Sequence, residues 1–198
     1  RSTGCGWRSW QKKGKKAMNI QAIRTACKRR GICTLITHAA TGQQWISDGA
    51  GVYPVEGIEI SKAALPALCN FDANELDKLS LSEALMADDR FTLEPIPNEQ
   101  DCEDLGMVYA LGQLFRALRT PNGILFIEAA ELRPAEGKGG IDRFTVRENA
   151  NGKLIAAYSG LLAKALIAPT SPGMHSHIMD ALDSLLRIGA DRTWINRS

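Results

Sequence analysis

The chain has 198 residues, 44% hydrophobic and 23% charged, with a formal net charge of +2. This composition is typical of a globular protein with one large core or two small lobes. No apolar run approaches the roughly 18 residues of a membrane span, so we expect no membrane partner. The five cysteines form no CxxC pair, which argues against a zinc site and a disulfide framework. The expectation is free thiols in a reducing, cytoplasmic environment.

The first seventeen residues differ from the rest of the chain. They hold six basic residues and no acidic one. The segment KKGKK at 12–16 corresponds to purine-rich codons just before the Met18 codon, as in a bacterial ribosome-binding site. We therefore expect residues 1–17 to be a translated leader and Met18 the natural start. The alternative is a basic arm that binds nucleic acid. Without the leader the net charge is +2 − 6 = −4.

Residues 18–30 have the spacing of a short amphipathic helix that ends at Gly31. Ile23 and Cys27 fall on its apolar face. The polar side carries four basic residues: Arg24, Lys28, Arg29 and Arg30. A capped surface helix has this composition, and so does a helix that contacts DNA. The second interpretation makes these four residues a candidate nucleic-acid-binding site.

A β-meander is predicted next, with strands at 32–37, 43–47 and 51–55 and turn signals between them. Ser61 is expected to begin a helix through Leu68. Asp72 is expected to cap another that runs towards Met86, with the leucines at 76, 79 and 85 facing inward. Residues 88–104 are polar and contain two prolines, which indicates an exposed loop or a hinge at 91–104 between two halves, 18–90 and 105–190.

The second half is predicted to consist of hairpins and one terminal helix. Residues 105–119 fit either a helix or a hairpin, and a hairpin is favoured. Strands are expected at 124–127 and 144–148 and within 154–167. A last helix opens at Pro172 and ends at Gly189, before a tail at 191–198. Because strands come in groups, the sequence predicts an α+β fold of antiparallel meander and hairpins with amphipathic helices packed on the sheet.

No catalytic motif is present. The glycine-rich segment at 137–140 lacks the spacing of a phosphate-binding loop. His175 and His177 are two residues apart with no third metal ligand nearby. There is no GxSxG motif, and no cysteine has an evident histidine partner. We therefore expect no enzyme, no cofactor and no resident metal. The alternative is a metal-dependent nuclease that holds Mg²⁺ through carboxylates at 88–89 or 101–104.

The strongest charge feature is an acidic section between residues 56 and 104. It holds thirteen acidic residues against three basic ones, a balance of 3 − 13 = −10. Such a surface attracts basic proteins and repels phosphate. The candidate partner-binding residues of this acidic face are Asp72, Glu75, Asp77, Asp88 and Asp89.

Three segments carry a resemblance to known proteins. QWISDG at 44–49, VYP at 52–54 and LLAKALIAP at 161–169 resemble segments of small phage and mobile-element proteins of gut Firmicutes. A leader fused to a natural start is similar to a fragment recovered from metagenomic DNA, a source of anti-CRISPR inhibitors of Cas9. The resemblance implies a non-enzymatic protein that inhibits a nucleic-acid-handling host protein such as Cas9 with guide RNA. The alternative is a DNA-binding accessory protein with a sliding-clamp-like half.

Overall fold

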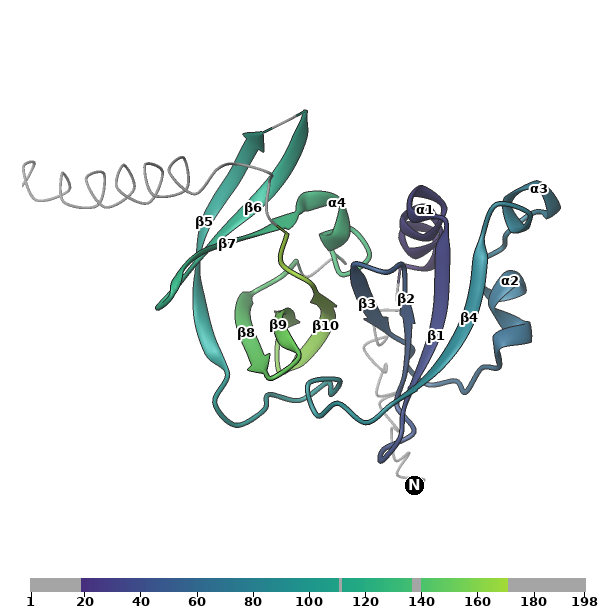
Figure 1. The fold of residues 1–198 in the computed structure, drawn as a ribbon, viewed down its shortest axis with the longest axis horizontal. Helices are drawn as coiled ribbons and strands as arrows, with labels where there is room; N and C mark the ends of the chain where they lie inside the picture. The colour runs from purple at the N-terminus through teal and green to yellow at the C-terminus, as the bar shows by residue number, and fades with distance from the viewer. Residues whose placement is uncertain (1–18, 111, 137–139, 171–198) are drawn as a thin grey trace, which may run out of the picture.

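A computed structural model describes residues 19–110, 112–136 and 140–170. They form an α+β fold built on one ten-stranded, mostly antiparallel sheet with the order β4-β1-β2-β3-β10-β9-β8-β5-β6-β7 (Figure 1). The strands are β1 (Ile32–His38), β2 (Gln44–Ser47), β3 (Gly51–Pro54), β4 (Ser80–Met86), β5 (Gln100–Ala110), β6 (Gln113–Thr120), β7 (Gly123–Glu128), β8 (Arg143–Asn149), β9 (Gly152–Ser159) and β10 (Leu162–Ile167). The helices are α1 (Ile20–Arg30), the 3-10 turn η1 (Lys62–Ala64), α2 (Leu65–Leu68), α3 (Ala73–Leu76) and α4 (Ala129–Leu132). The predicted fold class is confirmed.

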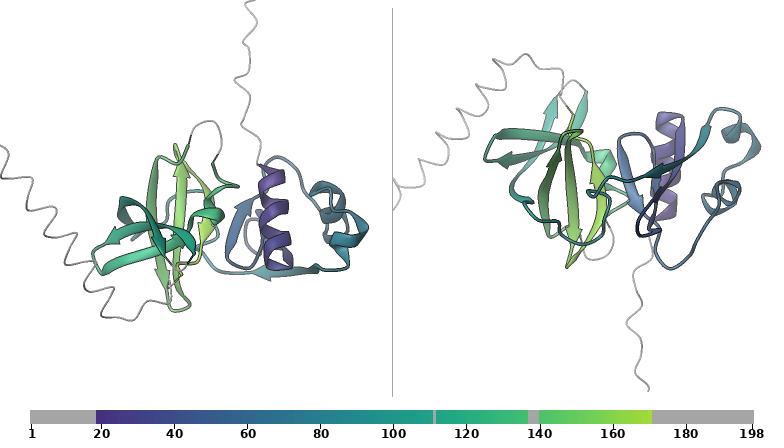
Figure 2. Two further views of the ribbon diagram at one scale, coloured as in Figure 1. Left: turned by 90° about the horizontal axis from the view of Figure 1, so that it is seen from above. Right: turned by 60° about the horizontal axis from the view of Figure 1, so that its bottom comes forward.

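The first helix and the meander follow the sequence signals closely. Asn19 caps α1 by accepting a hydrogen bond from the Ala22 N–H at 3.1 Å. Gly31 ends the helix at φ 71°, in the left-handed region that glycine adopts without a steric penalty. The β1–β2 and β2–β3 pairs are antiparallel, as predicted. Figure 2 shows α1 lying over one face of this part of the sheet, where Ile23 and Cys27 are fully buried.

The predicted helix from Asp72 towards Met86 is wrong beyond its first turn. Asp72 does cap α3, but the helix ends at Leu76. Residues 80–86 instead form β4, which pairs in parallel with β1. The Leu-Ser alternation at 79–82 has the period of two that suits a strand, and β1 pairs with one side of its backbone. Leu85, predicted to face inward, is 76% exposed.

The prediction of an exposed loop over 88–104 also needs correction. Residues 100–104 belong to β5, and the preceding segment buries Arg90 and Phe91. Arg147, which is fully buried, donates to the carbonyl oxygens of residue 92 at 2.7 Å and residue 94 at 2.8 Å. Its Nε also pairs with Glu99 at 2.6 Å. The segment from residue 92 to Glu99 is therefore held against the sheet by Arg147 of β8.

The hairpins of the second half are confirmed. Residues 105–110 lie in β5 and residues 113–119 in β6, which pair antiparallel, and β7 follows as the next antiparallel strand. The predicted 154–167 unit consists of two strands, β9 and β10, paired with each other. The glycine-rich loop at 137–139, His175, His177 and the helix predicted from Pro172 lie outside the described residues.

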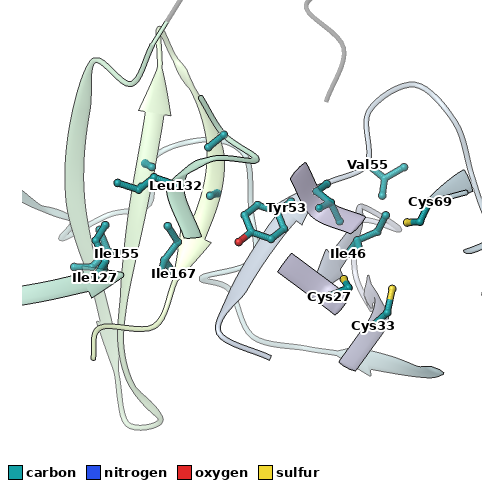
Figure 3. Packing of buried hydrophobic residues seen from close by; sticks show 14 of the residues in the cluster. Cys27, Cys33, Ile46, Tyr53, Val55, Cys69, Ile127, Leu132, Ile155 and Ile167 are labelled. Carbon is teal, nitrogen blue, oxygen red and sulfur yellow. The ribbon is translucent and has the colours of Figure 1, made fainter. Parts of the chain in front are cut away.

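The principal core draws on both halves of the sequence. Figure 3 shows Tyr53 between Ile46 on one side and Leu132 and Ile167 on the other, and all four belong to one cluster of buried side chains. The same cluster contains the thiol side chains of Cys27, Cys33 and Cys69. The strands before and after the 91–104 segment therefore share one hydrophobic core.

Candidate functional site

The two candidate sites predicted from sequence contact each other. Glu75, assigned to the acidic face, pairs with Arg24 at 2.7 Å and with Lys28 at 2.5 Å. Hydrogen bonds from Lys28 and Arg24 lower the pKa of Glu75 to about 2. The same carboxylate accepts from the Asp72 N–H at 3.0 Å and so completes the cap of α3. Glu75 is therefore occupied within the fold.

The other two cations of α1 have carboxylate partners as well. Arg30 Nη2 lies 2.8 Å from Glu131 Oε1 and 3.1 Å from Glu128 Oε1. Arg29 also pairs with Glu131. All four basic residues proposed as a DNA-contacting face are thus neutralised by acidic side chains from α3, β7 and α4. A surface in this state offers little net positive charge to phosphate.

Glu131 also anchors a buried polar cluster behind α1. The Tyr53 hydroxyl donates to Glu131 Oε2 at 3.0 Å, and both side chains are almost completely buried. The buried Asp48 uses one carboxylate oxygen to accept from the Gly51 N–H at 2.7 Å. Its other oxygen has no hydrogen-bond partner among the described residues. Burial and the neighbouring Glu131 raise the pKa of Asp48 to about 6.

The remaining acidic residues separate into paired and unpaired groups. Glu56, Asp88, Glu99, Glu103 and Asp104 all form ion pairs in addition to Glu75. Within the part of the chain that the structure describes, seven carboxylates of the acidic section are exposed and have no ion pair: Glu59, Asp72, Asp77, Glu83, Asp89, Glu94 and Asp101. These are the groups that can attract a basic partner.

The structure thus modifies the predicted acidic face. Asp77 and Asp89 are exposed and unpaired, whereas Asp88 binds Arg90 at 2.6 Å. Asp72 is exposed, but its carboxylate accepts from the Glu75 N–H at 2.9 Å as the cap of α3. Sequence reasoning missed Glu83, which lies in the middle of β4. The Leu-Ser alternation around it was the available signal, because it indicates a strand.

A surface hollow adjoins the end of β4. Its volume is about 570 Å³, and Leu85, Met86, Phe91 and Leu154 contribute its apolar lining. The paired side chains of Asp88 and Arg90 are part of the same lining. An apolar hollow beside unpaired carboxylates offers both a hydrophobic contact and a charge-based one.

The described residues contain neither a cluster of metal ligands nor a membrane-spanning helix. No group of three or more histidine, cysteine, aspartate or glutamate residues among them is arranged to hold a metal ion. No helix among them is long and apolar enough to cross a membrane. In particular, the Asp104 carboxylate of the proposed nuclease site accepts from Arg116 Nε at 2.8 Å.

Comparison with protein-family models, curated proteins and solved structures found no match.

Proposed function

We propose that this protein is a non-enzymatic inhibitor, of the kind carried by phages and mobile elements, that binds a nucleic-acid-handling host protein through its acidic surface. The observation that carries the proposal is the set of exposed, unpaired carboxylates around β4, above all Asp77, Glu83 and Asp89. Proteins that hold nucleic acid present positively charged channels, and an acidic surface can compete for them. Cas9 with guide RNA is the proposed partner because its heteroduplex channel is strongly basic.

The charge distribution supports this choice over direct binding to DNA. A DNA-binding face needs cations that are free to contact phosphate. On α1, Arg24 and Lys28 are held by Glu75, while Arg29 and Arg30 are held by Glu131. Three carboxylates (Glu75, Glu128 and Glu131) oppose the four cations of α1 and leave this face nearly neutral. The accessory-protein alternative would require these ion pairs to open.

The test is a pull-down with the full chain against two baits, Cas9 with guide RNA and plain duplex DNA, each at low and high salt. The proposal predicts capture of the Cas9 complex alone, with a loss at high salt because exposed charges are screened. Salt-sensitive capture of DNA alone would contradict it and favour the accessory-protein alternative. Nicking of the DNA that requires Mg²⁺ would favour the nuclease alternative.

A further inference from the structure

The sheet has two edge strands, β4 and β7, and they differ in how their outer edges are used. At β7 the Thr170 N–H donates to the Phe126 carbonyl at 2.8 Å, so the chain itself covers part of that edge. At β4, the Ser80 N–H donates to the Gly31 carbonyl, and the Met86 carbonyl accepts from the Ala39 N–H. Both hydrogen bonds lie at the ends of the β1–β4 pairing. Among the described residues, the outer edge of β4 has no backbone partner.

The β4 edge lacks most of the features that usually prevent edge-to-edge pairing, and Glu83 is its one charged residue. Its seven residues stay in unbroken register with β1 from Ser80 to Met86, without a bulge. The strand contains no proline and no lysine. Proteins commonly protect open edges with such devices, because free N–H and C=O groups form a template for another strand. A regular, open edge of this length is suited to strand addition.

Side chains around this edge specify the chemistry of an incoming strand. Glu83 projects as an unpaired carboxylate from the middle of β4, and Asp77 and Asp89 flank it in sequence. Leu85 is exposed, and the hollow lined by Met86 and other apolar side chains lies beside it. The combination suits a segment that alternates basic and apolar residues.

We infer that β4 is the docking edge for an extended, basic segment of the partner protein. The segment adds as an eleventh strand, places a lysine or arginine opposite Glu83 and inserts an apolar side chain into the hollow beside Leu85. That the incoming segment is basic rests on the proposed function, in which the partner is a positively charged protein. A second copy of this chain is a poor occupant, because antiparallel pairing centred on Glu83 would place two carboxylates opposite each other.

The test uses the full chain and a synthetic peptide, acetylated and amidated, of alternating lysine and valine with seven residues. Backbone amide hydrogen exchange is measured with and without the peptide. The inference predicts slower exchange at amides within 80–86. A control peptide with the central valine replaced by proline has the same charge but cannot complete the ladder. We expect it to bind at least tenfold more weakly. Equal binding of both peptides would overturn the inference, as would protection confined to other strands.

Two matched variants locate the charge contact. Glu83→Lys is expected to weaken peptide binding at least tenfold. Glu136→Lys, an exposed acid outside the acidic section, is expected to leave binding within twofold. Amides of 80–86 that are already protected in a self-associated protein, measured by analytical ultracentrifugation, would overturn the inference in favour of a second copy.

The inference and the proposed function fail separately. Peptide-dependent protection of β4 without capture of the Cas9 complex would retain the docking edge and remove Cas9 as its target. Capture of the complex without protection at 80–86 would retain the inhibitor function and overturn the docking edge.

Discussion

Arg147 and Glu99 form a buried ion pair in which Nε and Oε1 are 2.6 Å apart, although they are separated by 48 residues in sequence. The Tyr158 hydroxyl donates to the same Glu99 oxygen at 2.7 Å. Burial opposes ionisation of Glu99, but these hydrogen bonds and the positive charge of Arg147 together lower its pKa. The pair fixes the segment that leads away from β4 and its adjoining hollow.

Arg147→Lys is expected to destabilise the fold by about 3 kcal/mol, because lysine cannot serve the same set of acceptors and leaves buried groups unpaired. The matched control is Arg119→Lys, whose partner Glu103 has a side chain that is 61% exposed. This exchange should cost less than about 1 kcal/mol. Urea unfolding of both variants measures the difference, and equal losses would contradict the structural role of Arg147.

We expect Asp48 to make the stability of the fold depend on pH in an unusual way. Its folded-state pKa is raised to about 6, so its proton stabilises the fold at low pH, and this contribution is lost as the pH rises from about 4 through 6. Asp48→Asn retains an acceptor for the Gly51 N–H and supplies a donor towards Glu131. At pH 7 we expect this substitution to stabilise the protein by up to about 3 kcal/mol, with little difference at pH 4. Chemical unfolding across pH 4–7 checks this. A difference that does not change with pH would contradict it.

Gly51 is expected to resist substitution because of Tyr53. A Cβ at this position would overlap the Tyr53 hydroxyl, and the buried ring is held by Glu131. Gly51→Ala should therefore cost about 1–3 kcal/mol. In a Tyr53→Leu background the same change should cost much less, since the shorter side chain removes the overlap. Thermal unfolding is measured for the unmodified protein, the two single variants and the double variant. If the losses of stability of the two single variants simply add in the double variant, the overlap is not the cause.

The sequence predicted elements whose signals are local. The end of α1 at Gly31, the meander strands and the cap at Asp72 each depend on neighbouring residues. The failures depend on distant contacts. Residues 80–86 form a strand because β1 lies beside them, and the polar segment before β5 is ordered because Arg147 reaches its carbonyl oxygens.

The candidate site was predictable in composition but not in geometry. The acidic balance of residues 56–104 follows from the sequence. Which carboxylates are free does not, because Glu75 is neutralised by Arg24 from a helix 51 residues earlier. Glu83 is a candidate because it lies on an edge strand, and that placement depends on the pairing of β4 with β1.

The unpaired carboxylates around β4 are proposed to bind a basic partner. The most direct measurement is the affinity of the full chain for Cas9 with guide RNA, by biolayer interferometry. A variant combining Glu83→Lys and Asp89→Lys is compared with a control combining Glu136→Lys and Glu148→Lys, which changes the net charge equally. We predict at least a tenfold loss of affinity for the first variant and less than a twofold loss for the control. Equal affinities of the two variants, or no binding by the unmodified protein, would contradict the account.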